Sequence, residues 1–225
     1  MTFVYKDRPS DSSLVETIWY AQSEHAGSFI STASPHWEMV VTSYKGKTVF
    51  TVRGPETYAT PLHYQSIGAE WIGIRFKPGT FMPYLPPAAL RNFRDVNLPE
   101  ATSQSFWLGG TAWEFPDFEN ADTFVARLVR EGLLSRDPVV TAVLAGHPLD
   151  LSPRSLQYHF LRATGLTYKT IQQIERALQA KTLLEEGISI LDTVHQLGYY
   201  DQSHLTNSLK RFLGQTPAQI VRVSQ

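Results

Sequence analysis

The chain has 225 residues, enough for one large domain or two modest ones, each with its own hydrophobic core. Its 20 lysine and arginine residues nearly balance 21 aspartate and glutamate residues, and a formal net charge of −1 gives no indication of nucleic-acid binding. The absence of cysteine excludes disulfides, thiolate metal sites and thiol-based redox sensing. With no leader-like start and no run of eighteen apolar residues, the sequence predicts a soluble, cytoplasmic protein without a membrane partner.

Aromatic residues divide the chain into two parts. Residues 1–136 hold 21 of them and residues 137–225 hold six. Net charge differs little, at −2 for the first part and +1 for the second. We therefore expect a β-rich domain over residues 1–134 and a helical domain over residues 135–225, an α+β organisation overall.

The first hundred residues are rich in short β-type runs. Lys45-Gly46 lies between two of these runs and is typical of a hairpin turn. The pattern predicts a small sheet or barrel, with strands over residues 14–21, 37–44, 48–53 and 70–76.

The last of these strands has two different faces. Ile72, Ile74 and Phe76 share one face, while Trp71 and Arg75 share the other. An aromatic-lined concavity with a polar anchor suits a small organic effector. The competing interpretation is that the aromatic residues are core and that Arg75 pairs with Glu38 or Glu70 at the surface. The candidate effector residues are Trp37, Met39, Trp71, Arg75, Trp107 and Trp113.

An enzymatic interpretation has little support. His36 and Glu38 would point the same way on a strand, and with His63 they could begin a cupin-like metal site, but no fourth ligand is evident. Gly109-Gly110 lacks the flanking pattern of a phosphate loop. We therefore expect no catalytic residue, metal or cofactor. Two alternatives stay open for the N-terminal part: a metal-dependent enzyme, or a dimerisation module that binds no ligand.

Prolines then divide the chain into turns and short helical pieces, such as residues 88–93. Residues 120–134 have the apolar spacing of an amphipathic helix, with Phe124, Leu128 and Leu133 facing inward. Because this helix adjoins both halves of the chain, it is the expected place of coupling between them.

Residues 138–164 have the pattern of a helix-turn-helix unit. Asp137 and Pro138 begin a short apolar helix that ends at His147-Pro148. Ser152 and Pro153 begin a second helix, which Thr164-Gly165 ends. Leu156, Phe160 and Ala163 would face inward on this second helix, whereas Arg154, Gln157 and Tyr158 would face outward.

A second unit of the same kind follows over residues 189–213. Ser189 and Asp192 have the spacing of a capping box, and Gly198 ends the first short helix. Residues 202–213 form the next predicted helix, with Leu205, Leu209 and Phe212 inward and Ser203, Thr206, Asn207 and Lys210 outward.

A long helix is predicted between the two units, over residues 168–186. Its apolar stripe comprises Ile171, Ile174, Leu178 and Leu183. Its length of about 28 Å is close to the ~34 Å repeat of the DNA major groove, so one chain could place two recognition helices on one side of a duplex.

Several of these motifs together resemble the DNA-binding domain of AraC-type bacterial transcription regulators, over about 85 residues in register. The motifs that carry the resemblance are Leu151 to Gln157 with Phe160, Ala163-Thr164-Gly165, Glu175-Arg176-Ala177 with Leu183-Leu184, Leu197-Gly198-Tyr199, Asp201 to Leu205, and Lys210-Arg211-Phe212 with Gly214 and Thr216-Pro217.

The resemblance implies a double helix-turn-helix domain that contacts promoter DNA, together with a β-rich sensory domain that binds an effector, dimerises or does both. By position, the base-contacting residues would be Arg154, Gln157, Tyr158, Gln202, Ser203, Thr206 and Asn207. We expect phosphate contacts from Ser152, His204, Lys210 and Arg211. The expected partners are promoter DNA, a small organic effector and RNA polymerase, and the expected state is a monomer or a homodimer.

The sequence departs from the family pattern at three positions. Tyr158 and Asn207 stand where arginine is frequent, and Leu161 stands where a basic residue is common. Fewer cations release fewer counterions, so DNA binding should depend less steeply on salt concentration.

Overall fold

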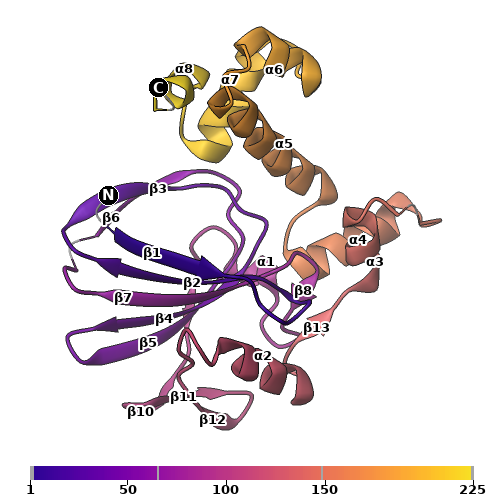
Figure 1. Cartoon of the computed structure of the whole chain (residues 1–225). Coiled ribbons are helices and arrows are strands. Elements are labelled where there is room, and N and C mark those ends of the chain that lie inside the picture. Colours follow the sequence, from indigo (N-terminus) through magenta and orange to yellow (C-terminus); the bar gives the residue numbers. More distant parts are fainter. Residues whose placement is uncertain (1–2, 65, 148, 224–225) are drawn as a thin grey trace. The chain divides into compact units, whose positions relative to one another are not determined.

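The computed structural model describes residues 3–64, 66–147 and 149–223 (Figure 1). The described strands are β1 (Phe3–Arg8), β2 (Val15–Ser23), β3 (Gly27–Ser31), β4 (Glu38–Tyr44), β5 (Lys47–Arg53), β6 (Thr60–Tyr64), β7 (Glu70–Phe76), β8 (Thr80–Phe81), β9 (Val96–Asn97), β10 (Glu100–Thr102), β11 (Ser105–Leu108), β12 (Thr111–Glu114) and β13 (Ser135–Arg136). The helices are α1 (Pro87–Leu90), α2 (Ala121–Arg130), α3 (Pro138–Leu144), α4 (Pro153–Thr164), α5 (Tyr168–Glu185), α6 (Ile190–Gln196), α7 (Gln202–Leu213) and α8 (Pro217–Val223). The α+β class is confirmed.

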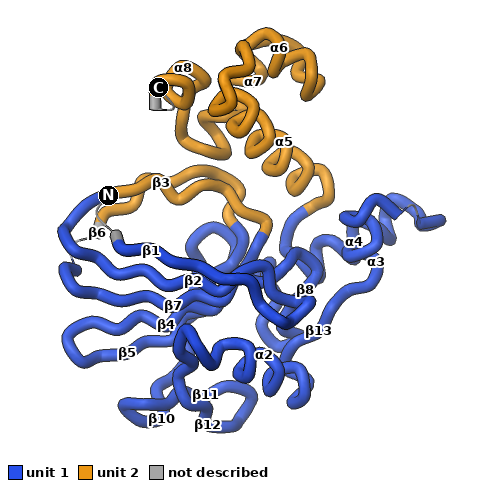
Figure 2. The backbone as a smooth tube through the Cα atoms, viewed as in Figure 1, with its two compact units in different colours: residues 1–27, 36–55, 64–166 blue, residues 28–35, 56–63, 167–225 orange. Residues whose placement is uncertain are grey.

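The chain forms two compact units, shown in different colours in Figure 2. Unit 1 comprises residues 1–27, 36–55 and 64–166, and unit 2 comprises residues 28–35, 56–63 and 167–225. The polypeptide thus passes several times between the units, and helices α3 and α4 belong to the unit that contains the large sheet. The predicted domain boundary between residues 134 and 135 does not coincide with the boundaries of these units. It concerns function and stays a prediction.

A six-stranded antiparallel sheet of order β1-β2-β7-β4-β5-β9 is the centre of unit 1. Its four inner strands correspond to the four predicted β runs. The β4–β5 hairpin turns at Lys45 and Gly46, whose φ values of 50° and 74° fit a tight hairpin turn, as predicted. β1 was not predicted, and it pairs with β2 along its whole length. Among the described strands the sheet is open, ending at β1 and β9.

One face of the sheet forms the hydrophobic core with α2 and the three-stranded sheet β10-β11-β12. The ring of Phe50 on β5 stacks on Phe106 of β11, with centroids 4.2 Å apart, and lies 5.9 Å from Phe124 of α2. Trp113 of β12 meets Phe124 edge to face at 5.7 Å. Aromatic packing therefore fixes α2 against this face of the sheet.

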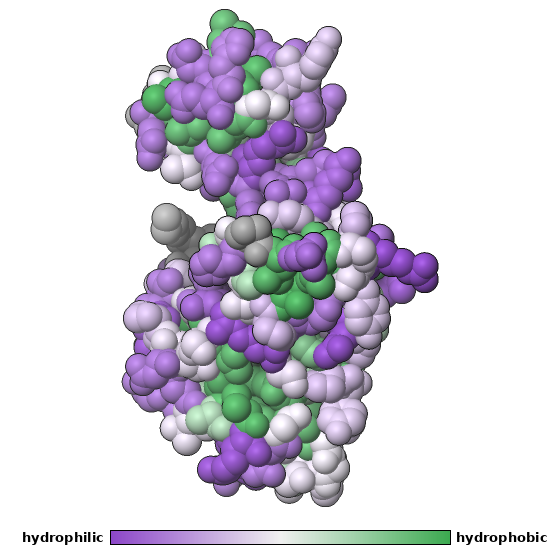
Figure 3. Space-filling model, turned by 90° about the vertical axis from the view of Figure 1, so that its right-hand side faces the viewer, coloured by the Kyte–Doolittle hydropathy of each residue, from purple (hydrophilic) through white to green (hydrophobic). Residues whose placement is uncertain are grey.

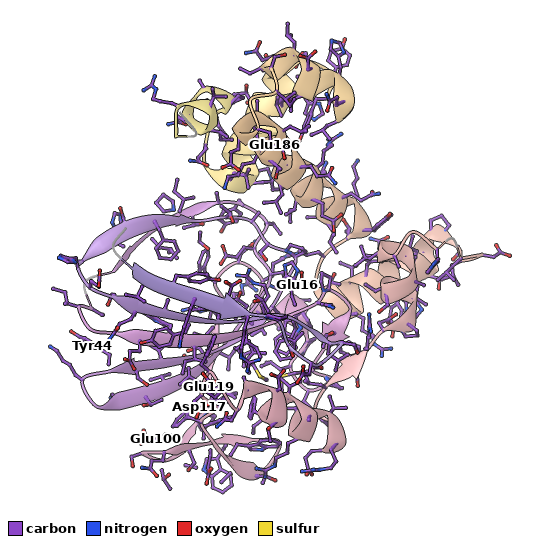
Figure 4. All side chains as sticks on the ribbon, viewed as in Figure 1. Glu16, Tyr44, Glu100, Asp117, Glu119 and Glu186 are labelled. Atoms are coloured by element: carbon purple, nitrogen blue, oxygen red, sulfur yellow. The ribbon has the colours of Figure 1, made fainter. Side chains whose placement is uncertain are left out.

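Polar contacts fix the start of α2. Asp117, labelled with Glu119 in Figure 4, accepts hydrogen bonds from the backbone N–H groups of Glu119 (2.9 Å) and Asn120 (2.7 Å). Asp122 in the first turn pairs with Arg8 of β1 at 2.6 Å. Burial would raise the pKa of Asp122, but hydrogen bonds from Ser10 and Arg8 outweigh it and hold this pKa below its usual value.

Helix α2 is shorter than predicted, because Gly132 adopts a φ of 71° two residues after its end. Leu133 is nevertheless buried, as expected. Helix α1 lies where a short helical piece was predicted over residues 88–93, but it ends at Leu90.

Local signals place the ends of α3 and α4. Asp137 accepts hydrogen bonds from the N–H groups of Val139 (3.0 Å) and Val140 (3.2 Å), so it caps α3 as predicted. Ser152 caps α4 by accepting from Ser155 N–H at 3.2 Å, and Gly165 ends α4 in the left-handed conformation. Pro148, part of the predicted end of the first helix, lies outside the described residues.

Helix α5 has 18 residues and is about 27 Å long. Its buried residues are Ile171, Ile174, Ala177, Ala180 and Leu184. The predicted stripe was wrong at Leu178, which is 39% exposed. Ala177 and Ala180 are buried instead, on a helix that packs against α6, α7 and α8.

Candidate DNA-binding surface

The first helix-turn-helix unit comprises α3 and α4. Asp137 joins its two helices, since one carboxylate oxygen caps α3 and the other lies 2.8 Å from Nδ1 of His159 on α4. Phe160 and Ala163 are buried, as predicted, and Leu156 is half-buried. The outward face carries Arg154, Gln157 and Tyr158, all exposed, with Tyr158 at 60%. The three predicted base-contacting residues therefore lie together on the solvent side of α4.

The second unit comprises α6 and α7. Ser189 and Asp192 form the predicted capping box, in which Asp192 N–H donates to Ser189 Oγ at 3.1 Å. Asp201 caps α7 by accepting from His204 N–H at 2.7 Å, and Gly214 ends this helix. Leu205, Leu209 and Phe212 are buried, as predicted. On the outer side of α7, Gln202, Ser203 and Asn207 are exposed and Thr206 is half-buried.

Tyr199 fixes the orientation of α7, a role that the sequence did not indicate. Its buried ring lies 4.3 Å below the Arg176 guanidinium of α5 and meets the ring of His204 edge to face at 5.2 Å. Its hydroxyl lies 3.2 Å from Ser208 Oγ on α7. Contacts from α5 and α7 therefore meet at one aromatic side chain, in the turn before α7.

His204 has the hydrogen-bond geometry of a neutral ring that can donate outward. Its Nδ1 accepts from the N–H of Tyr200 at 3.3 Å. A neutral imidazole that accepts at Nδ1 carries its proton on Nε2. His204 is exposed, so this N–H suits the predicted phosphate contact, and Ser152, Lys210 and Arg211 are exposed as well.

Tyr200 is a further candidate that sequence reasoning missed. It lies in the turn before α7 and is 91% exposed. Tyrosine hydroxyls are among the side-chain groups that donate to DNA phosphates. Its place beside Asp201 was the signal, because Asp201 caps α7, the helix predicted to contact DNA.

The chain's formal net charge is −1, and its surface mixes hydrophilic and apolar residues. Figure 3 shows this for the side of the protein that carries α3 and α4. Any DNA affinity therefore rests on individual cations and hydrogen-bonding side chains rather than on a broad basic field.

The six candidate effector residues do not share one surface. Trp37 and Met39 are buried in the core, where Trp37 stacks on Phe76 at 4.1 Å. Trp113 is also in the core, with its Nε1 donating to the carbonyl of Leu108 at 3.0 Å, while Trp107 is 47% exposed on β11. Only Trp71 and Arg75 lie on the face of β7 opposite the core, because strand alternation places Met39 beside Ile74 and Glu38 beside Arg75.

That second face of the sheet collects further polar and aromatic groups. Arg75 donates from Nε to Glu38 at 2.5 Å, confirming one of the two ion pairs considered. The ring of Trp19 on β2 stacks with Tyr5 of β1 at 6.5 Å and covers Gly73. Its Nε1 is buried and has no hydrogen-bond partner within the described ranges. Sequence analysis missed Trp19, since its alignment with Gly73 depends on strand register.

His36 lies next to this face. Burial, and to a smaller degree the charge of Arg75, lowers the pKa of His36 to about 4. His36 is therefore neutral at physiological pH. Across residues 3–64, 66–147 and 149–223, no three His, Cys, Asp or Glu side chains form a group that could hold a metal ion. Within the same ranges, no helix has the length and apolar character to cross a membrane.

Comparison with known proteins bears on the helical part of the chain. A family model for a helix-turn-helix domain matches residues 147–222. The chain is also similar to the HTH-type transcriptional regulator VirS of Mycobacterium tuberculosis, in strains CDC 1551 / Oshkosh and ATCC 25618 / H37Rv. The identity is 39% over 72 residues, 32% of this chain and 21% of VirS.

The chain thus matches about a fifth of the length of these relatives. No solved structure matches it significantly. The matched segment contains α4 to α7, the capped helices and the polar outer faces described above. Residues 147–222 of this chain therefore match a helix-turn-helix domain, as the resemblance to AraC-type regulators predicts.

Proposed function

We propose that this protein is a sequence-specific DNA-binding transcription regulator with two recognition helices, α4 and α7. The observation that carries the proposal is the repeated design of the two units. In each, a side chain caps the recognition helix, apolar residues bury its inner face, and hydrogen-bonding side chains occupy its outer face. The match to a helix-turn-helix family and the similarity to a transcriptional regulator support it.

In this proposal, each unit has some residues that contact bases and others that contact phosphates. Arg154, Gln157 and Tyr158 contact base edges from α4, and Gln202, Ser203, Thr206 and Asn207 do so from α7. These side chains offer the donors and acceptors that base edges recognise in the major groove. Ser152, His204, Lys210 and Arg211 contact phosphates, with Tyr200 as an added candidate.

The second face of the large sheet is the proposed effector site. It combines the aromatic surfaces of Trp19 and Trp71 with the Arg75–Glu38 ion pair and the unpartnered Nε1 of Trp19. A planar organic molecule with a hydrogen-bond acceptor would satisfy the indole donor. Such an effector would shift the protein between conformations by its differential affinity for them. Titration with candidate effectors, followed by tryptophan fluorescence, tests this site, and Trp19→Phe should abolish the response.

DNA binding is tested by fluorescence anisotropy. The protein is titrated onto a duplex from the region upstream of its own gene and onto a scrambled duplex of equal composition, at several salt concentrations. A preference of about a thousandfold for the upstream duplex would support the proposal. Equal affinity for both duplexes, with and without cell extract as a source of effector, would contradict it.

A further inference from the structure

A two-stranded ribbon belongs to the same compact unit as the second helix-turn-helix unit. This β3–β6 ribbon comprises residues 28–35 and 56–63 (Figure 2). Beyond the paired strands, Ser34 and Glu56 exchange both backbone hydrogen bonds, at 3.0 and 2.9 Å. Ser31 Oγ also donates to the Glu56 carboxylate at 2.9 Å. The ribbon is therefore held together by its own hydrogen bonds.

Both halves of the ribbon donate to the carboxyl end of recognition helix α7. The N–H of Ala33 donates to the carbonyl of Phe212 at 2.7 Å, and the N–H of Ala59 donates to the carbonyl of Arg211 at 2.7 Å. The last four carbonyls of an α-helix have no partner within the helix. Two of those carbonyls are thus capped by amides more than 150 residues earlier in the chain.

Close packing accompanies these hydrogen bonds. Ala33 is only 2% exposed. Gly214, which follows α7 with a φ of +69°, leaves no room for a side chain: a Cβ there would lie 2.9 Å from Ile30 Cγ2 and 3.3 Å from Ala59 Cβ. A glycine at this position thus serves both the helix end and the approach of the ribbon.

The contact leaves the outer face of α7 open. Gln202, Ser203 and Asn207 lie in the first half of the helix and are exposed while the ribbon is bound at the other end. A contact that holds one end of a recognition helix and exposes the other fixes the helix without covering the side chains that meet DNA.

The ribbon is also a continuation of the large sheet along the chain. β3 follows β2 and precedes β4, while β6 follows β5 and precedes β7. The four flanking strands, β2, β4, β5 and β7, are neighbours in the six-stranded sheet. Of these, β4 and β7 carry Glu38, Trp71 and Arg75. A change on that face is therefore covalently linked to both halves of the ribbon through short connections.

We propose that Ala33 and Ala59, through their backbone amides, are positioning residues for recognition helix α7, and that the β3–β6 ribbon links the sheet domain to sequence-specific DNA binding. The proposal rests on the proposed function. It also moves the place of coupling from helix α2, expected from the sequence, to the ribbon.

Amide hydrogen exchange tests whether the ribbon stays on α7 when DNA binds. The N–H groups of Ala33 and Ala59 donate to the carbonyls of Phe212 and Arg211, so each amide exchanges slowly while its hydrogen bond persists. Exchange is measured by NMR on the free protein and on the protein saturated with the upstream duplex. The amide of Leu209, within α7, is the reference for protection by the helix itself.

Both amides should be protected in the free protein and should stay protected in the DNA complex. Unprotected exchange of both amides in the free protein would overturn the contact. Protection that is lost when the upstream duplex binds would overturn the positioning role, because the ribbon would then have to leave α7 before DNA binds.

Removal of the two donors tests the positioning role itself. Ala33→Pro and Ala59→Pro each delete one N–H. Tyr58→Pro changes the same ribbon without deleting either donor and serves as the control. Each donor variant should lower the preference for the upstream over the scrambled duplex about tenfold, with binding to the scrambled duplex unchanged. A simple loss of folding would weaken binding to both duplexes.

An unchanged preference in both donor variants would overturn the proposal. Failure of the proposed function is recognisable separately, since the unaltered protein would then prefer neither duplex. In that case hydrogen exchange would still report the ribbon contact, and the positioning role would fall together with DNA binding.

Discussion

The carboxylate of Asp137 and the imidazole of His159 lie 2.8 Å apart and connect the two helices of the first helix-turn-helix unit. Asp137 is 3% exposed and also caps α3. One buried side chain therefore sets both where α3 begins and how α4 lies against it.

Asp137→Ala should destabilise the protein by about 1–3 kcal/mol, because it removes a helix cap and leaves the half-buried His159 nitrogen without its partner. Urea unfolding measures the difference in free energy. Asp150→Ala, an exposed change in the following turn, is the control and should alter stability by less than about 0.5 kcal/mol. Equal effects of the two substitutions would show that Asp137 does not hold the unit together.

Gly73 and Trp19 make a second testable pair. A Cβ at Gly73 would overlap the indole of Trp19, although Gly73 has an ordinary negative φ. Gly73→Ala should therefore destabilise the protein by about 2 kcal/mol or more, and the cost should shrink below about 1 kcal/mol in a Trp19→Ala background. Thermal or urea unfolding of the four proteins gives the coupling energy.

Gly46→Ala is the matched control for this cycle. Gly46 has a φ of +74° and no atom near the place of a Cβ, so the loss of stability in Gly46→Ala comes from backbone strain alone. This loss should not depend on Trp19. Strictly additive costs for Gly73→Ala and Trp19→Ala would mean that the two residues are not in contact in solution.

The half-buried His36 predicts a pH dependence of stability. Its folded pKa of about 4 lies below the ordinary value of 6.5, so between these pH values the unfolded chain binds more protons than the folded one. The contribution of His36 to the free energy of unfolding is complete above pH 6.5 and is lost as the pH falls towards 4. Because His36 is partly exposed, we expect a loss of about 1–2 kcal/mol.

His36→Gln should flatten the slope of unfolding free energy against pH between 6.5 and 4. His147→Gln, at an exposed position, should leave the slope unchanged. A slope that survives in His36→Gln would assign the pH dependence to other groups.

The sequence predicted the parts of the fold that local chemistry determines. Ser152, Asp201 and Gly165 act through neighbours within four residues, and the ends of α4 and α7 agree with prediction to the residue. Alternation along residues 70–76 correctly separated Ile74 from Arg75.

Other features depended on contacts far apart in the chain. The sequence could not show that Met39 pairs beside Ile74, so core and effector-face residues were grouped together. The strands of the β3–β6 ribbon, GSFIS and TPLHY, lack an alternating apolar pattern, and their hydrogen bonds to α7 join segments more than 150 residues apart. Leu178 was misplaced because neighbouring helices, rather than periodicity alone, determine which side of α5 is covered.

The base-contacting assignments predict separable effects in the two units. Arg154→Ala and Gln202→Ala should each weaken binding to the upstream duplex by about 1–3 kcal/mol. Binding to the scrambled duplex should change much less. Lys47→Ala, an exposed cation in the β4–β5 hairpin, is the control for loss of charge. Identical losses on both duplexes would make these residues general electrostatic contacts rather than base contacts.

The central claim is that one chain binds DNA specifically through two recognition helices, and hydroxyl-radical footprinting on the upstream duplex tests it most directly. The proposal predicts two protected segments about one helical turn apart, of which one is weakened by Arg154→Ala and the other by Gln202→Ala. A single protected segment that is insensitive to one of these substitutions, or no protection at all, would contradict it.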